Sequence, residues 1–357
     1  MKVKIGDITK IKTGKLDANA SSEDGEYPFF TCAKEPLKIS TYSYDCECVL
    51  VAGNGDLNVK YYNGKFDAYQ RTYIIENDSN GRLFMPYLYY FMEDYVEELR
   101  KQAIGGVIKY IKLGNLTEAK IELPDVETQK AIAMILSKSN EVLDSRYRQL
   151  VMMDNLIKAR FVEMFSDESN MMKMSDICSI ITDGTHQPPK FVTEGIPFIF
   201  VSNVVSNKLT YDTEKYITQE TYDELIKRTP IEIGDILLST VGSYGHPAVV
   251  ESDRKFLFQR HIAYLKPKKE IVDSNYLHGA LLSPGAQRQI EEGVKGIAQK
   301  TLNLSEIKKM VIPIPDLLKQ KQFADFVKQV DKSKVVVQKA FDETQKLYNS
   351  LLQEYFG

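Results

Sequence analysis

The sequence predicts an α+β protein in which two repeated mixed α/β domains are separated by a long antiparallel helical coiled coil. Three observations predict it. One half of the 357-residue chain matches the other, each half alternates short β-rich runs with turns, and each half ends in a long apolar heptad pattern. An apolar content of 43% lets each domain bury its own core. The expected boundaries are residues 1–122 and 169–312 for the two domains, and 123–168 and 313–357 for the helical regions.

The repeat is defined by short matching segments that occur in the same order in both halves. Residues 4–8 align with 173–177, 27–29 with 196–198, 66–71 with 256–260, 115–116 with 303–304, and 124–130 with 315–321. The third match pairs Gln70-Arg71 with Gln259-Arg260. Ordered matches of this kind indicate two domains of one ancestral type.

Each half has the same predicted elements. Strands are expected at residues 48–52, 71–76, 236–240 and 261–266, between Gly, Asn and Pro turns. A helical segment follows in each half, at residues 85–102 and 275–292, and then a much longer helix.

The long helices carry a seam of apolar residues near seven-residue spacing. We expect this seam to consist of Leu136, Leu143, Leu150 and Ile157 in the first helix and Phe323, Val330, Val337, Phe341, Tyr348 and Leu351 in the second. The alternative is a pair of helices that each pack on their own domain. Because residues 126–163 would span roughly 55 Å, more than the width of a small domain, the coiled coil is favoured.

Net charge argues against a protein that coats nucleic acid, because the chain carries a formal charge of only −3. Lysines still concentrate between residues 2 and 15, and Lys and Arg between residues 254 and 269. These clusters are either local surfaces for nucleic acid or ordinary solvated faces.

Several classes of protein are disfavoured. The N-terminal residues lack an apolar leader core and no run is long enough to cross a bilayer, so we expect a cytoplasmic protein and no membrane partner. The four cysteines do not form a disulfide framework. A zinc site at Cys32, Cys46 and Cys48 would lack a fourth ligand at metal spacing, so we expect no metal site.

We expect no catalytic residues and no cofactor in this chain. It has neither a glycine-rich cofactor loop nor a phosphate loop, and residues 187–190 only superficially match the Asn/Asp-Pro-Pro-Tyr signature of amino-methyltransferases. The strings Glu118-Ala119-Lys120 and Glu306-Ile307-Lys308 have the Glu-x-Lys spacing of Mg²⁺-dependent nucleases. Ordinary surface charge is the competing explanation.

Polar loops supply the candidate contacts to DNA. The second half offers Thr182, Asp183, Gly184, Thr185 and His186, whose side chains suit base edges on a loop fixed by glycine and two prolines. A general-base role for His186 is the alternative to a solvated loop histidine. The corresponding loop of the first half is more basic, with Lys12, Thr13 and Lys15, and suits phosphates.

Further candidates come from matching loops in the two halves. They are Asn54, Asn58, Lys60 and Tyr61 in the first half, Ser243 and Tyr244 in the second, and the Gln-Arg pairs Gln70, Arg71 and Gln259, Arg260. Gln can pair with adenine and Arg with guanine. The alternatives are plain turn chemistry for the loops and a structural arginine that ties strand to loop.

Together these motifs resemble the specificity subunits of type I restriction-modification systems. The resemblance rests on four features. Each half opens with a segment that ends in Asp-Ile, at Asp7-Ile8 and Asp176-Ile177, and each long helix is preceded by Pro-Asp, beginning at Pro124 and Pro315. The other two features are the Asp-Gly-Thr-His string followed by Pro189, and residues 158–165. The resemblance covers essentially the whole chain, although the first half lacks the Asp-Gly-Thr-His string.

The resemblance implies two target recognition domains that each read one half of a split site in double-stranded DNA, alternating with two conserved helical regions. It also implies two modification (methyltransferase) subunits that carry S-adenosylmethionine, and restriction/translocase subunits that use ATP and Mg²⁺. The alternatives are an autonomous Mg²⁺-dependent endonuclease and a coiled-coil adaptor that binds only protein.

Overall fold

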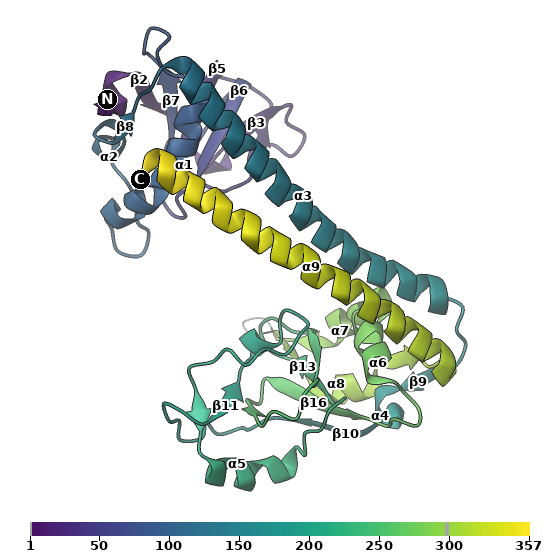
Figure 1. The fold of residues 1–357 in the computed structure, drawn as a ribbon. Coiled ribbons are helices and arrows are strands. Elements are labelled where there is room, and N and C mark those ends of the chain that lie inside the picture. The colour runs from purple at the N-terminus through teal and green to yellow at the C-terminus, as the bar shows by residue number, and fades with distance from the viewer. Residues whose placement is uncertain (1, 297–299) are drawn as a thin grey trace. The chain divides into compact units, whose positions relative to one another are not determined.

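The computed structural model describes residues 2–296 and 300–357 and divides into two compact units. Unit 1 comprises Met1–Tyr147 and Lys339–Gly357, and unit 2 comprises Arg148–Gln338. Two 40-residue helices, α3 (Val126–Phe165) and α9 (Leu317–Phe356), contribute residues to both units. Helices and strands mix within each unit (Figure 1), so the predicted α+β class is confirmed.

Unit 1 is built on a six-stranded sheet with the order β2-β7-β5-β6-β3-β4. Its strands are β2 (Thr9–Thr13), β3 (Tyr27–Phe30), β4 (Leu37–Ile39), β5 (Tyr44–Ala52), β6 (Val59–Ala68) and β7 (Thr72–Asn77). The short strands β1 (Lys2–Lys4) and β8 (Lys120–Glu122) pair separately. The remaining elements are η1 (Ile5–Asp7), η2 (Ala18–Ala20), α1 (Met85–Gln102) and α2 (Leu113–Thr117).

One buried core of unit 1 lies between this sheet and α1. Val49 of β5 and Ile75 of β7 are fully buried in one cluster with Leu88 and Met92 of α1. The burial of this helix face follows from its apolar spacing, because residues three or four apart lie on one side of a helix.

Unit 2 contains a four-stranded sheet, β10-β16-β13-β14, and a three-stranded sheet, β12-β11-β15. Its strands are β9 (Met171–Lys173), β10 (Cys178–Asp183), β11 (Ile196–Ile199), β12 (Tyr216–Ile217), β13 (Ile236–Ser239), β14 (Pro247–Val249), β15 (Leu257–Phe258), β16 (Ile262–Pro267), β17 (Val294–Lys295), β18 (Thr301–Leu302) and β19 (Val311–Pro313). Its helices are α4 (Met174–Ile177), η3 (Val201–Asn203), α5 (Gln219–Leu225), η4 (Ile226–Arg228), α6 (Ser274–Leu281), α7 (Pro284–Gly293) and α8 (Leu304–Lys309).

The predicted helices agree with the structure except in one place. Residues 85–102 and the long segments after Pro124 and Pro315 are helical, as expected. The segment 275–292 is wrong as a single helix, because it is broken into α6 and α7. Ser283 accepts a hydrogen bond from the Ala286 backbone N–H, and Pro284 occupies the first turn of α7, which starts a new helix.

The two units share a pattern of backbone hydrogen bonds around a parallel strand pair. Phe29 of β3 pairs with Asp67 of β6, and Phe198 of β11 pairs with Leu257 of β15. The backbone N–H of Gln70 donates to Leu16 O at 2.8 Å, and that of Arg260 donates to Thr185 O at 3.0 Å.

These bonds correct the predicted match between the two Gln-Arg pairs. The Tyr69 N–H donates to Phe30 O and the Gln259 N–H donates to Ile199 O, so Tyr69, and not Gln70, corresponds to Gln259. Gln70 therefore corresponds to Arg260. The two Gln-Arg dipeptides are identical in sequence, but they occupy structural positions that differ by one residue.

Within each unit, segments of α3 and α9 pack against one another. In unit 1, Leu136 and Leu143 are buried in a cluster with Tyr348 and Leu352, against which Phe341 and Leu351 also pack. In unit 2, the rings of Phe161 and Phe323 meet edge to face at 5.4 Å, and Ile157 and Val327 pack against the same core. Val330 is buried, whereas Leu150 and Val337 are half-buried.

Among residues 2–296 and 300–357, no helix combines the length and hydrophobicity needed to cross a bilayer.

Candidate nucleic-acid interface

The end of β10 places the candidate loop of unit 2. Asp183 is the last residue of this strand and pairs with Ala263 of β16. Gly184 then approaches the turn that joins β15 to β16 so closely that a Cβ atom would lie 2.3 Å from Phe258 O. Only glycine fits this approach, and the loop that follows is therefore held against the turn that carries Gln259 and Arg260.

Asp183 joins two basic side chains across a long sequence separation. Its Oδ2 lies 2.8 Å from His186 Nε2, and its Oδ1 accepts a hydrogen bond from Arg228 Nη2 at 2.6 Å. Arg228 Nη2 and His186 Nε2 are 3.4 Å apart. The Asp183 side chain is only 18% exposed, whereas His186 and Arg228 are each about half exposed. The carboxylate thus orients two half-exposed basic groups.

His186 and Arg228 border a cavity of about 590 Å³. It is lined by residues 184–190 on one side and by Thr221, Glu224, Leu225, Lys227, Arg228 and Thr229 on the other. Arginine and lysine donors with an imidazole and a glutamine can bond phosphates or base edges. Gly184, Thr185 and His186, three of the predicted contact residues, line this cavity, and Asp183 orients His186 and Arg228 at its edge.

A second group lies on the turn between β15 and β16. Arg260 is exposed, and its Nε donates to His261 Nε2 at 3.4 Å. Burial, and then the Arg260 charge, lower the pKa of His261, which favours its neutral, accepting form. Asp183, Arg260 and His261 border a cavity of about 230 Å³. Asp183 therefore adjoins both groups.

The matching strand end in unit 1 has different side chains. Thr13 ends β2, and Lys15 is exposed beyond it. The Gln70 amide donates to Asp17 Oδ1 at 2.8 Å. Lys12 forms an ion pair with Glu76. Burial lowers the pKa of Lys12, but the hydrogen bond and charge of Glu76 outweigh it and leave that pKa raised.

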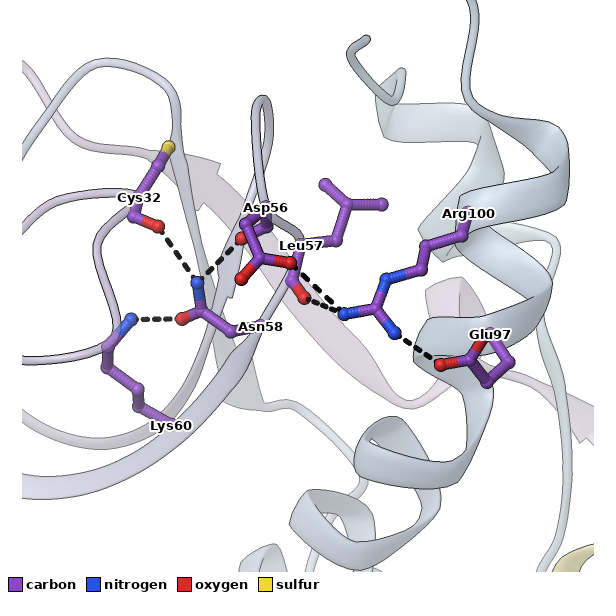
Figure 2. Close-up of polar contacts among 7 residues, drawn as sticks. All are labelled: Cys32, Asp56, Leu57, Asn58, Lys60, Glu97 and Arg100. Atoms are coloured by element: carbon purple, nitrogen blue, oxygen red, sulfur yellow. Dashed lines mark hydrogen bonds and ion pairs between the residues drawn. The ribbon is translucent and has the colours of Figure 1, made fainter. Parts of the chain in front are cut away.

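The loop after β5 is held by hydrogen bonds within unit 1. The Asn58 amide nitrogen donates to Cys32 O and to Asp56 O, both at 2.8 Å, while Asn58 Oδ1 accepts from Lys60 (Figure 2). Burial lowers the pKa of Lys60. The sequence made Asn58 and Lys60 candidate DNA contacts, and the structure places their polar atoms against the protein.

Arg100 of α1 braces the same loop from the other side. Its Nη2 donates to Leu57 O at 3.0 Å and lies 3.2 Å from Asp56 Oδ1, and the guanidinium also pairs with Glu97 (Figure 2). Neither Arg100 nor Arg228 was among the predicted site residues. Each acts on a residue more than 40 positions away, and neither stands in a motif that sequence reasoning could detect.

The other predicted residues are dispersed. Tyr61 is exposed, and its hydroxyl donates to Glu47; burial, together with that carboxylate, raises the pKa of Tyr61 to about 12. Ser243 is exposed and Tyr244 packs on the core of unit 2. The remaining candidates are half-buried Asn54, Thr182 and Gln259 and exposed Arg71.

The nuclease-like strings lie in surface ion pairs. Glu118 pairs with Lys4 at 2.7 Å, and Glu306 with Lys309 at 3.2 Å. In the part of the chain that the structure describes, no three His, Cys, Asp or Glu side chains gather as metal ligands would. The predicted absence of a metal site stays a prediction.

Comparison with protein families assigns the chain. A family model described as "Type I restriction modification DNA specificity domain" matches residues 1–145 and 166–341. The chain belongs to this family. The two matched ranges account for most of both units.

Individual relatives differ in how much they share. The chain is 37% identical to the EcoDI specificity subunit of Escherichia coli over 156 residues, which is 44% of this chain and 34% of that protein. It is 21% identical to the MjaVIII specificity subunit of Methanocaldococcus jannaschii over 98% of this chain and 90% of that one. The chain therefore spans about a third of the first relative and nearly all of the second.

A solved structure has a similar fold. The S subunit of the type I restriction-modification system from M. genitalium superposes with a TM-score of 0.60 at 16% identity, covering 100% of this chain and 96% of that one. At this identity the likeness establishes the fold alone.

Proposed function

We propose that this chain is the non-catalytic DNA-recognition subunit of a type I restriction-modification complex, in which each unit reads one half of a split site in double-stranded DNA. The Asp183, His186 and Arg228 cluster at the edge of the 590 Å³ cavity carries the proposal. A carboxylate that fixes an exposed arginine and histidine presents oriented donors, which base recognition in the major groove requires. Family membership supports the same function.

The candidate residues fall into three groups. In unit 2, His186, Arg228 and Arg260 would contact bases, because these side chains are exposed around Asp183. In unit 1, the exposed Gln70 and Arg71 would contact bases, and Lys15 would contact phosphate. Asn58, Lys60 and Lys12, whose polar atoms bond within the protein, would shape the surface instead.

The two reading domains would be separated by an antiparallel coiled coil of α3 and α9. Within unit 2, Phe161 meets Phe323 while the earlier Asp154 pairs with the later Lys334, so the two helix segments run in opposite directions. Within unit 1, the buried Leu136 and Leu143 and their α9 partners supply a matching apolar seam. These contacts support residues 123–168 and 313–357 as the two helical regions.

The outer faces of these helices would dock two modification subunits. Unit 1 exposes Met134, Ile135, Val142, Tyr147 and Leu347, and unit 2 exposes Val151, Met152, Leu156, Val335 and Val336. Apolar side chains grouped on exposed helices are typical of protein interfaces. The partner subunits would supply S-adenosylmethionine, ATP and Mg²⁺, and the complex would act in the cytoplasm.

The proposal is tested by Arg228→Ala in the chain reconstituted with its modification subunits. Methylated positions in the source genome first define the split site. We expect Arg228→Ala to reduce discrimination at one half-site by about tenfold, because a base contact contributes about 1 to 3 kcal/mol. Competition binding with duplexes altered in either half-site measures this effect.

Lys227→Ala is the matched control, because it removes the same charge from the neighbouring residue of the same cavity. We expect it to weaken binding to all sequences alike and to leave discrimination unchanged. The proposal is wrong if the wild-type complex shows no preference for the split site, a result that would favour a protein-only adaptor.

A further inference from the structure

The segment between α1 and α2 exposes an aliphatic tip that the proposed reading residues do not explain. Val107 is fully exposed and Ile108 is 63% exposed. Exposure of two adjacent β-branched aliphatic side chains on one loop is unfavourable in water, and it suggests a surface that is covered in a complex.

The tip is a closed loop. Ile104 and Tyr110 exchange backbone hydrogen bonds, Ile104 N to Tyr110 O at 3.0 Å and Tyr110 N to Ile104 O at 2.8 Å. Gly105 has a φ of +120°, and a Cβ atom there would lie 2.6 Å from Ile108 O. Glycine at this position lets the chain reverse tightly and directs residues 106–109 outward.

The base of the loop is fixed to the braced loop after β5. The Gly55 N–H donates to Lys109 O at 3.0 Å, and the Ile111 N–H donates to Gly53 O at 2.9 Å. Arg100 holds Asp56 and Leu57 in that same loop (Figure 2). The aliphatic tip is therefore presented by a supported base beside Asn54, a candidate reading residue.

The charge around the tip favours a polyanion. Residues 99–117 contain four basic residues and no acidic one. Arg100 and Lys101 pair with acids outside this range, which leaves Lys109 and Lys112. Lys109 and Lys112 are exposed, and among the described residues neither has an ion pair with an acid. Two cations without an acidic partner close in sequence to an apolar tip match a duplex, which has phosphates outside and apolar base faces inside.

We infer that Val107 and Ile108 form a wedge that enters a groove of the bound duplex and unstacks a base step, while Lys109 and Lys112 contact the flanking phosphates. This role rests on the proposed DNA recognition and adds to it a distortion of the duplex. Apolar side chains that enter a base step bend DNA, and the bend increases the contact between protein and duplex. The wedge would thus read how easily a step deforms.

Unit 2 has the same base for a loop. The Gly242 N–H donates to Lys300 O at 3.3 Å, as Gly55 does to Lys109, and Gly296 has a φ of +103° like Gly105. Residues 297–299, Ile-Ala-Gln in the sequence, lie outside the described residues.

The test uses the full chain in complex with its modification subunits and a duplex that carries 2-aminopurine at successive positions of the split site. Wild type should raise 2-aminopurine fluorescence at one step within the half-site read by unit 1. Val107→Ser with Ile108→Ser should abolish that rise and weaken binding at least about tenfold. Leu37→Ser, which changes another exposed aliphatic residue of unit 1, should change neither quantity.

The other outcomes separate this wedge from the proposed function. If wild type prefers the split site but fluorescence and affinity are the same in the double variant, the wedge is overturned and the recognition function stands. If the double variant is folded by circular dichroism yet fails to bind the modification subunits, the tip is a protein contact and the wedge is again overturned. If wild type shows no sequence preference, both proposals fail.

Discussion

The ends of β2 and β10 have similar backbones and different chemistry. A Cβ atom on Gly14 would lie 2.2 Å from Ala68 O, and one on Gly184 would lie 2.3 Å from Phe258 O, at matching positions of the two units. The strand residue before each glycine is Thr13 in unit 1 and Asp183 in unit 2. Thr13 offers one hydroxyl, whereas Asp183 holds His186 and Arg228.

This difference shows which parts of the site are fixed by the fold. Close backbone packing sets where each loop begins, because a glycine is required in both units. The side chains that follow are free of that constraint, so each unit can present its own donors. Two such surfaces could read two unrelated half-sites on one kind of frame.

The largest effect is expected from filling the two close approaches. Gly14→Ala and Gly184→Ala should each lower the free energy of unfolding of their own unit by about 3 kcal/mol, because the added Cβ overlaps backbone oxygen that cannot move aside. Hydrogen exchange measured by mass spectrometry, compared between β2 with β7 and β10 with β16, reports each unit separately.

Gly106→Ala is the control, since nothing lies within 4 Å of a Cβ atom there. It should leave exchange in both sheets unchanged. If Gly184→Ala accelerates hydrogen exchange in its own unit and Gly14→Ala does not, the claim that both strand ends require glycine is wrong.

A smaller effect is expected from the two corresponding turn residues, Gln70 and Arg260. If unit 2 reads one half-site as proposed, Arg260→Ala should cost about 1 to 3 kcal/mol of discrimination there, since arginine pairs with guanine through two bonds. Gln70→Ala should cost less, because its amide already donates to Asp17. Competition binding with each half-site altered in turn measures both.

Substitutions at these positions also test whether Gln70 or Arg71 corresponds to Arg260 in function. If Arg71→Ala, and not Gln70→Ala, matches the effect of Arg260→Ala, the sequence alignment of the Gln-Arg pairs describes function better than the hydrogen-bond register does. Insoluble Arg260→Ala protein would instead make Arg260 a structural residue.

The helices were predictable because their signal is local. Leu136 and Leu143 are seven residues apart, and this spacing alone places them on one buried face. The segment 85–102 was likewise recognised from its own residues. The break at Ser283 could have been suspected from the serine and proline that follow one another there.

The site was less predictable because its contacts are distant in sequence. The loop with Asp183 and His186 could be proposed from polar residues beside glycine and proline. Its partner Arg228 lies 45 positions from Asp183 and has no pattern around it. Asn58 has the residue type of a base contact, but its amide bonds Cys32 O, which only the fold brings near. Residue type therefore indicated the loop of Asp183 and His186, whereas only the packing shows which polar side chains are left exposed and which bond within the protein.

The smallest predicted effect concerns acid stability, for which the units differ in histidine content. Unit 1 has no histidine, whereas unit 2 contains all four, His186, His246, His261 and His278. His278 is half-buried, and its Nε2 lies 3.0 Å from Asn207 O and 3.1 Å from Pro247 O. Burial lowers the pKa of His278, and it also lowers the pKa of His246 and His261.

A histidine whose pKa is lower in the folded state binds fewer protons there than in the unfolded chain. Stability contributed by keeping it neutral is therefore present above the unfolded pKa, about 6.5, and is lost as the pH falls below that value. One such proton changes the free energy of unfolding by at most about 1.4 kcal/mol per pH unit.

Between pH 7.5 and 5.5, hydrogen exchange in β10 and β16, corrected for its intrinsic pH dependence, should show unit 2 losing stability. His278→Gln should flatten that dependence, because its amide can still donate to a carbonyl and does not titrate. Exchange in β2 and β7, measured in the same samples, reports on unit 1. Because unit 1 has no histidine, it should not show the loss of stability that histidine protonation causes in unit 2. Equal slopes for wild type and His278→Gln would show that His278 does not set the acid limit of unit 2.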